Sequence, residues 1–165
     1  MRVLVVYESI TGNTRLVAET VATALAAHGR TELVEVARAP TSIPDDLTLL
    51  VVGASTQTFT LGRGKDVRDG ANQFAARGRT LAEWLDRLHV PLGYAAAAFD
   101  TRVKRPFLPG SAAKTTEKRL NNVGFRIVTP AEGFIIDGNT GALIAGELER
   151  ATLWGSQLGA VAARR

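Results

Sequence analysis

Three runs of apolar residues, 3–7, 47–54 and 94–99, constrain the fold of this chain more than any other feature. The first two are nearly continuous in apolar and β-branched side chains, which is typical of strands buried on both faces of a sheet. The third is mostly alanine and would also suit a helix, but Gly93 before it and its place in the alternation of elements favour a strand. Its small side chains predict that helices pack close against it.

Weaker strand patterns and several helical patterns complete the series. Strands are predicted at 31–36 and, interrupted by a turn, at 125–128 and 134–136. Helices are predicted at 15–27, from about 70 to 88, at 111–122 and at 146–163. Five strands that alternate with helices indicate an α/β fold, a three-layer sandwich in which helices cover both faces of a five-stranded parallel sheet. We find neither an internal repeat nor a domain boundary, so residues 1–165 are predicted to form a single domain.

The chain contains no cysteine and only two histidines. The lack of cysteine excludes disulfides, thiolate metal sites, iron–sulfur ligation and a cysteine nucleophile. His28 and His89 both follow predicted helices, where the helix dipole favours a basic ring, and we expect both to be structural or exposed to solvent. The sequence therefore predicts no metal site, and it shows no cluster of nucleophile and base that would indicate hydrolysis.

Hydrophobic residues make up 45% of the chain and charged residues 22%, the balance of an ordinary globular protein. No apolar run approaches the roughly 20 residues that a membrane-spanning helix requires. The apolar run near the N-terminus is too short for a signal peptide. We therefore expect a cytoplasmic protein without a membrane span.

The net charge is +4, and the positive excess lies in two segments. Residues 63–79 hold five basic and two acidic side chains, and residues 102–119 hold six basic and one acidic side chain. The two segments follow the third and fourth predicted strands, so both begin at the carboxyl edge of the sheet. They lack the interleaved aromatic residues of a surface on which nucleic-acid bases stack, so we expect no nucleic-acid partner. Their positive potential would attract an acidic protein or a small anionic substrate.

The segment Ser-Ile-Thr-Gly-Asn-Thr at 9–14 joins the first predicted strand to the first predicted helix. A helix N-terminus has unpaired amide donors and a partial positive charge, and it therefore attracts phosphate. Gly12 permits a positive φ and a close approach of the backbone to an anion, and three hydroxyl groups add donors. A turn of this composition can also simply cap a helix. Ligands of such sheets bind outside the carboxyl ends of the strands, however, so we expect this segment to bind phosphate.

This segment resembles the T/S-x-T-G-x-T phosphate loop of the flavodoxins, which is matched here by Ser9, Thr11, Gly12 and Thr14. The order of elements resembles that family over essentially the whole chain. The resemblance implies the strand order 2-1-3-4-5, FMN as the cofactor, and loops after the third and fourth strands that flank the isoalloxazine ring. The residues that it implies for cofactor binding are Ser9, Ile10, Thr11, Gly12, Asn13, Thr14, Ser55, Thr56, Gln57, Thr58, Phe59, Asp100, Thr101 and Arg102. The last three belong to a predicted loop at 100–110.

The chain departs from the family pattern in two respects. Flavodoxins usually hold the ring between large aromatic side chains, of which these loops offer only Phe59 and Phe107. Many flavodoxins are also acidic around the flavin, whereas this chain is basic there. Three functions remain open: an FMN protein that passes electrons to an acidic partner, an FMN-dependent oxidoreductase of a quinone or porphyrin, and an interaction module without flavin. The first two share the cofactor, so we expect a redox protein.

Overall fold

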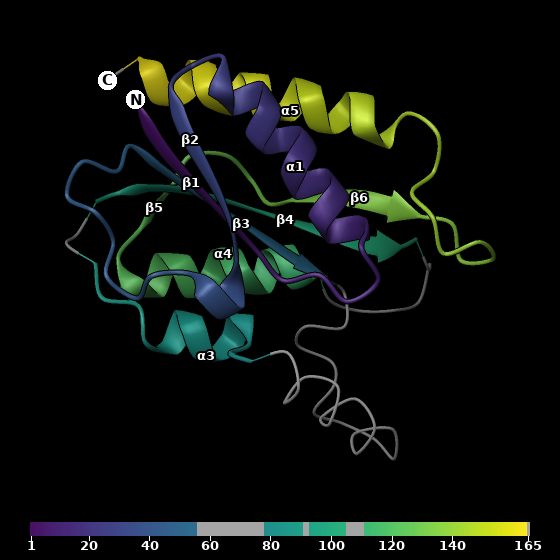
Figure 1. Ribbon diagram of the computed structural model, residues 1–165, viewed down its shortest axis with the longest axis horizontal. Helices are drawn as coiled ribbons and strands as arrows, with labels where there is room; N and C mark the ends of the chain where they lie inside the picture. The colour runs from purple at the N-terminus through teal and green to yellow at the C-terminus, as the bar shows by residue number, and fades with distance from the viewer. Residues whose placement is uncertain (56–77, 91–92, 105–110, 165) are drawn as a thin grey trace.

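The structure, a computed structural model, describes residues 1–55, 78–90, 93–104 and 111–164 of the chain. Its strands form one parallel sheet in the order β2-β1-β3-β4-β5, with β6 also paired to β4 (Figure 1). The strands are β1 (Arg2–Tyr7), β2 (Arg30–Glu35), β3 (Leu49–Ser55), β4 (Ala95–Val103), β5 (Arg126–Ile127) and β6 (Glu132–Ile136). The predicted strand order is therefore confirmed.

The fifth position of the sheet is filled by two short strands in succession. β5 pairs with the beginning of β4, where Ala95 lies opposite Arg126, and β6 pairs with its end, where Val103 lies opposite Ile136. The sequence predicted an interrupted strand, because Pro130 breaks the apolar pattern, but it placed Glu132 and Gly133 in the turn, whereas both belong to β6.

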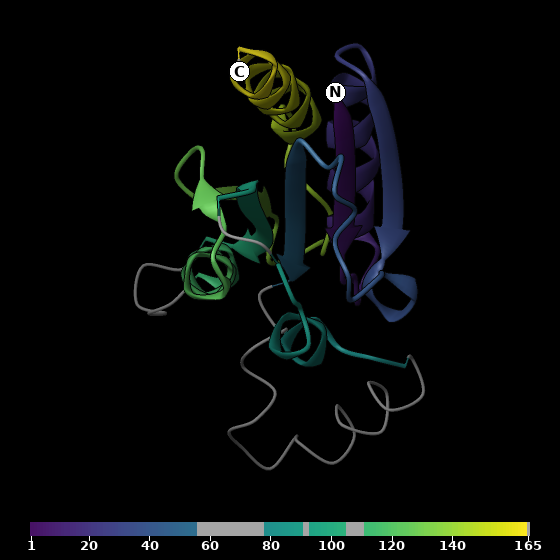
Figure 2. The same cartoon turned by 90° about the vertical axis from the view of Figure 1, so that its left-hand side faces the viewer.

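The helices form two layers, one on each face of the sheet (Figure 2). α1 (Asn13–Ala26) and α5 (Glu147–Ala163) cover one face, and α3 (Leu81–Asp86) and α4 (Ala112–Val123) cover the other. A short 3-10 helix, η1 (Val36–Arg38), follows β2. No helix in the part of the chain that the structure describes is long and apolar enough to cross a membrane.

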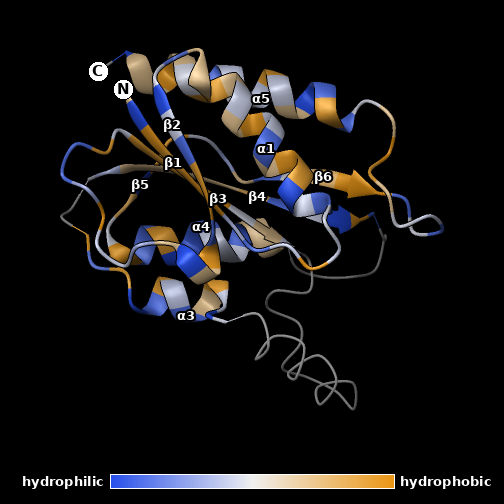
Figure 3. Ribbon diagram, in the orientation of Figure 1, coloured by the Kyte–Doolittle hydropathy of each residue, from blue (hydrophilic) through white to orange (hydrophobic). Residues whose placement is uncertain are grey.

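Two cores lie between these layers, because successive residues of a strand point to opposite faces of the sheet. In β1, Val3 and Val5 face α1 and α5, whereas Leu4 and Val6 face α3 and α4. All seven residues of β3 are buried, as predicted for a strand covered on both faces. The helices carry both hydrophobic and hydrophilic residues, as expected where only one side of a helix is buried (Figure 3).

Several aromatic side chains and His28 pack between the sheet and the helices. Trp154 meets Phe99 and Phe134 edge to face, with ring centroids 5.9–6.1 Å apart. Trp84 is fully buried, and its indole Nε1 donates to the backbone oxygen of Pro40 over 2.8 Å. His28 packs against Gly159 of α5, where a Cβ atom would lie 2.3 Å from the imidazole. His28 was expected to be structural or exposed to solvent, and its contact with Gly159 shows that it is structural.

Two predicted boundaries are wrong. Residues 100–103 were predicted to be loop, but they continue β4, because β6 offers them a parallel partner from Phe99 to Val103. The helix predicted to begin near residue 70 is not helical at 78–80: Gly78 has φ +90°, and the Thr80 side chain caps α3, which begins at Leu81.

Candidate functional site

The loop between β1 and α1, residues 8–12, leads into a helix whose first amides have no side-chain cap. Gly12 is the N-cap residue of α1, with φ 97° and ψ −18°. The Gly12 carbonyl accepts from Leu16 N over 3.0 Å and closes the first turn, and the Ser9 hydroxyl accepts from Gly12 N over 3.1 Å. Thr11 and Gly12 are exposed, and apart from Gly12 and its two neighbours no atom of the described residues lies within 4 Å of the place that a Gly12 Cβ would occupy. A phosphate therefore fits in front of the α1 amides, where the helix dipole favours an anion.

The charge beside this loop is also compatible with an anion. Arg15 lies in the first turn of α1 and pairs with Glu19 over 2.7 Å, and that hydrogen bond raises the pKa of Arg15 above its usual value. Arg15 therefore stays protonated, in an exposed position. Tyr7, the last residue of β1, is almost completely buried, and burial raises the pKa of its phenol. Tyr7 is therefore neutral and adds no negative charge to the site.

Thr14 does not face the open side of the loop. It is 1% exposed, and its hydroxyl lies 2.7 Å from that of Thr101 in β4, which is 2% exposed. The α1 residues that are buried with it are Val17, Ala18, Val21, Ala22 and Leu25. Thr14 lies three and four residues before Val17 and Ala18, so helical periodicity could have shown that its side chain points into the protein.

Asn13 joins the loop to the turn between β6 and α5. Its amide nitrogen donates to the Gly141 carbonyl over 2.7 Å and lies 3.5 Å from the Thr11 hydroxyl. The turn itself is closed by Asp137, whose carboxylate accepts from Asn139 N and Thr140 N. No pattern in the sequence indicated that two residues 128 positions apart would meet here.

Asp100 contacts the N-terminus of α4. It is fully buried, and one carboxylate oxygen accepts from the Ser111 hydroxyl over 2.6 Å and from Ala113 N over 2.9 Å. A carboxylate in this position is stabilised by the helix dipole and by the first amides of the helix. These two contacts connect β4 to α4, and both are accepted by the same carboxylate oxygen, Oδ2.

Arg102 has a fixed position at the end of β4. Its Nε lies 3.7 Å from Asp100 Oδ1, and its guanidinium lies over Gly133, where a Cβ would come within 2.7–2.9 Å of it. The side chain is 36% exposed, and Lys104, two residues further on, is exposed. The absence of a side chain at Gly133 thus makes room for a cation at the carboxyl edge of the sheet.

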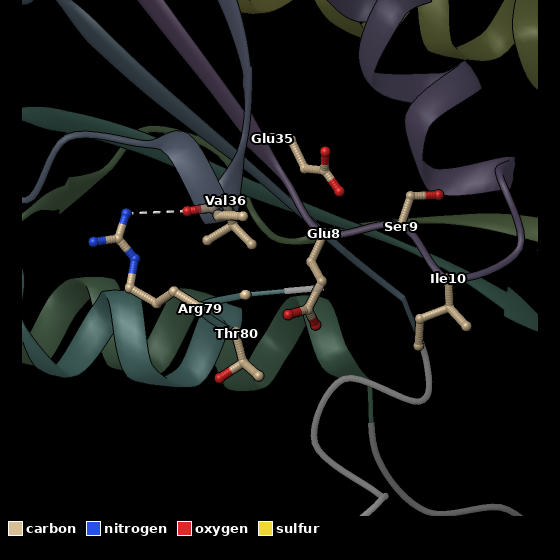
Figure 4. Close-up of a pocket in the computed structure, with 9 residues that line it drawn as sticks. Glu8, Ser9, Ile10, Glu35, Val36, Arg79 and Thr80 are labelled. Atoms are coloured by element: carbon tan, nitrogen blue, oxygen red, sulfur yellow. Dashed lines mark hydrogen bonds between the residues drawn. The ribbon is translucent and has the colours of Figure 1, made fainter. Parts of the chain in front are cut away.

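A surface hollow of about 280 Å³, open to solvent, lies on the other side of the loop (Figure 4). It is lined by Glu8, Ser9, Ile10, Glu35, Val36, Ala37, Gly78, Arg79 and Thr80. Glu8 accepts from Leu81 N over 2.7 Å, and the Arg79 guanidinium donates to the carbonyls of Val36 and Ala39. The two carboxylates at this hollow, Glu8 and Glu35, disfavour an anion there. The α1 amides therefore suit phosphate better than this hollow does.

Sequence reasoning named Ser9 and Ile10 but missed the other residues that line this hollow. Glu8 was the available signal, because a carboxylate directly after a strand buried on both faces needs a polar partner. That partner, the first amide of α3, is 73 residues away in the chain and could not be identified without the fold.

The predicted site residues are brought together only in part. Ser9–Thr14, Ser55 and Thr101 lie at one edge of the sheet, where Ser55 and Thr101 are neighbours in the register of β3 and β4. Thr56, Gln57, Thr58 and Phe59 lie outside the described residues, as do Phe107 and the basic residues Arg63, Lys65 and Arg105. The described residues contain no group of three or more His, Asp or Glu side chains that could hold a metal ion.

Comparisons with known proteins agree with this geometry. A sequence model of the family described as Flavodoxin matches residues 5–147. Flavodoxin 1 from Bacillus cereus superposes with a TM-score of 0.67 and 18% identity, over 100% of this chain and 99% of that one. A flavodoxin from Streptococcus pneumonia TIGR4 gives a TM-score of 0.66 and 16% identity, over 97% and 99% of the two chains. A WrbA-like flavodoxin from Agrobacterium tumefaciens gives 0.58 and 18%, over 98% and 96%. No curated protein matches the chain in sequence.

Proposed function

This chain belongs to the flavodoxin family, and from that membership we propose that it passes electrons to an acidic partner protein, which binds beside the flavin. Flavodoxins bind FMN, and FMN is the cofactor of this chain. When bound, FMN supplies the redox chemistry, and the protein supplies binding, orientation and charge. The proposal concerns which residues bind the cofactor and which kind of protein receives the electrons.

We propose that the FMN phosphate binds at the N-terminus of α1. The supporting observation is the uncapped first turn behind Gly12, with its positive φ and its open front. In this arrangement the α1 amides and the Thr11 hydroxyl donate to the phosphate oxygens. Ser55 is the last residue of β3, and Thr101 lies beside it near the end of β4. Both are proposed to lie along the cofactor, together with Thr56, Gln57, Thr58 and Phe59.

The observation that favours an acidic partner is the charge at the end of β4. Arg102 has a fixed position there, Lys104 is exposed, and Lys114 is exposed in the first turn of α4, which begins at the same edge. The nearby negative charge of Asp100 is buried against the α4 N-terminus and Arg102. The exposed charges that the structure describes at the end of β4 and in the first turn of α4 are therefore positive, and they would steer a negatively charged surface toward this part of the edge.

The phosphate site predicts a preference for FMN over riboflavin. FMN is expected to bind in a one-to-one ratio, and riboflavin, which lacks the phosphate, is expected to bind at least tenfold more weakly, since charge-assisted hydrogen bonds contribute about 1.5–3 kcal/mol. Titration of the apoprotein with each flavin, followed by fluorescence quenching, measures the two constants. Equal affinities would contradict the phosphate site.

The acidic partner predicts a steep dependence of electron transfer on salt. The rate of flavin reoxidation by an acidic acceptor protein should fall between 0.01 M and 0.1 M salt, because the Debye length shrinks from about 30 Å to about 10 Å. Lys104→Glu combined with Lys114→Glu should slow this reaction and leave the flavin absorption spectrum unchanged. Stopped-flow second-order rates across a salt series measure both effects.

The matched control is Arg126→Glu, which reverses an exposed charge at the opposite edge of the sheet, where β5 begins. It should leave the rate with the acidic acceptor unchanged.

A neutral quinone as acceptor tests the alternative of a small-molecule oxidoreductase. Two results together would favour that alternative. The protein would reduce the quinone rapidly, and its electron-transfer rate to the acidic protein would change neither with salt nor in the double variant.

A further inference from the structure

Most of the partly buried arginines in the described part of the chain use their guanidinium groups within the protein. Arg2, Arg79, Arg119 and Arg150 donate hydrogen bonds to carboxylate or backbone carbonyl oxygens. Arg102, which is also partly buried, differs. It makes an ion pair with Asp100 over 3.7 Å, and among the described residues no acceptor lies within hydrogen-bond distance of its guanidinium. A guanidinium carries five N–H donors, so Arg102 is a candidate for binding an acceptor from outside the chain.

The position of the Arg102 guanidinium is fixed by two neighbours. Its Nε, Cζ and Nη2 atoms lie 2.7–2.9 Å from the place that a Gly133 Cβ would occupy, so the planar group lies flat over Gly133. Asp100 pairs with the Nε side, and its other carboxylate oxygen is held by the Ser111 hydroxyl and Ala113 N. Because the guanidinium is already placed, little conformational entropy is lost when an acceptor binds to it.

Arg102 lies on the side of β4 that faces away from the proposed cofactor. The preceding residue, Thr101, contacts Thr14 of α1, and successive residues of a strand point to opposite faces of the sheet. Arg102 therefore shares the α4 face with Asp100, and it lies over Gly133 of β6, on the opposite side of β4 from β3. This position suits a group that arrives from solvent beside the flavin better than it suits the flavin itself.

We propose that Arg102 docks the acidic partner by pairing its guanidinium with a carboxylate of that protein, and that Gly133 is the positioning residue for this contact. The inference rests on the proposed function. Lys104 and Lys114 are exposed and attract the partner at long range, whereas Arg102 acts at contact. A guanidinium fork binds both oxygens of a carboxylate, which an ammonium group does not. Arg102 thus selects acidic surfaces that present a carboxylate at this point.

The test uses the FMN-loaded protein and an acetylated hexaglutamate peptide, whose flexible carboxylates can adapt to the guanidinium. Arg102→Lys keeps the charge and removes the fork, so the dissociation constant of the peptide should rise about fivefold, the upper end of what exposed ion pairs contribute. Gly133→Ala should have a similar effect, because the new Cβ displaces the guanidinium. NMR titration measures the affinities, and the Nε–H signal of Arg102 should shift on binding in the wild type.

Gly138→Ala is the matched control for the glycine substitution. Its Cβ would lie 3.1 Å from Val103 Cγ1 and would not displace Arg102. This variant should bind the peptide like the wild type. Gly133→Ala should keep the melting temperature of the wild type, because the group that must move is the end of a flexible side chain. Arg102→Lys should keep the FMN affinity of the wild type.

Three results would overturn the proposal. Equal peptide affinities of the wild type and Arg102→Lys would mean that charge alone explains binding. Weaker FMN binding in Arg102→Lys would mean that Arg102 holds the cofactor. Wild-type peptide affinity in Gly133→Ala would refute the positioning role of Gly133. A wild type that did not bind the peptide at 0.01 M salt would contradict the acidic partner itself, so failure of the proposed function is distinguishable from failure of the docking residue.

Discussion

Gly12→Val is expected to abolish measurable FMN binding while the apoprotein still folds. Valine at φ 97° strains the backbone, at a cost on the order of 1–3 kcal/mol. No atom beyond the neighbouring residues lies within 4 Å of the new Cβ in the part of the chain that the structure describes, so the substitution causes no clash there. The branched side chain would instead fill the space in front of the α1 amides that the phosphate needs. Titration with FMN and thermal melting of the apoprotein measure the two effects separately.

Gly146→Val is a close control for this substitution. Gly146 is the N-cap residue of α5, with φ 90° and ψ −12°, and it too has no atom within 4 Å of its Cβ position. The strain should be the same, but FMN binding should be unaffected. Retention of FMN by Gly12→Val would refute the assignment of the phosphate to this loop. A loss of FMN in both variants would show that strain, not contact with phosphate, explains the effect.

The sheet could be predicted from the sequence because its central strands are buried on both faces. The runs that form β1 and β3 have no face exposed to water, so polar residues do not alternate with apolar ones and the apolar patterns are nearly continuous. The order of the strands came from the family resemblance, because an apolar pattern does not specify a neighbour. The end of β4 was missed for a physical reason: Asp100, Thr101 and Arg102 are polar, and their partners in α4, α1 and β6 are distant in sequence.

The candidate site could be located from the sequence, but the directions of its side chains could not be read from the motif. Gly12 has the positive φ that the phosphate loop requires, as expected. The hydroxyl of Thr14, which was counted among the donors to phosphate, also lies 2.7 Å from the Thr101 hydroxyl. Asn13 likewise uses its amide on Gly141. A motif identifies residue types at a spacing, and the packing of the helix decides which of them face the ligand.

The end of β4 leads to the largest expected effect on stability. Asp100→Ala should lower the free energy of unfolding by about 3 kcal/mol, because hydrogen bonds to a buried carboxylate are strong and their removal leaves buried donors without partners. The donors are the Ser111 hydroxyl and Ala113 N, and Arg102 loses its buried counter-ion. Urea unfolding of the apoprotein, followed by circular dichroism, measures this change.

Asp137→Ala is the matched control, because Asp137 also accepts from two backbone amides, over 2.7 and 3.2 Å, but in an exposed turn. Water can replace those bonds, so the loss should be about 1 kcal/mol or less. Asp100→Asn keeps the size of the side chain and one acceptor oxygen, and it should fall between the wild type and Asp100→Ala. Equal unfolding free energies for Asp100→Ala and Asp137→Ala would mean that burial does not strengthen the contact between β4 and α4. The inference that Asp100 holds the N-terminus of α4 against β4 would then be refuted.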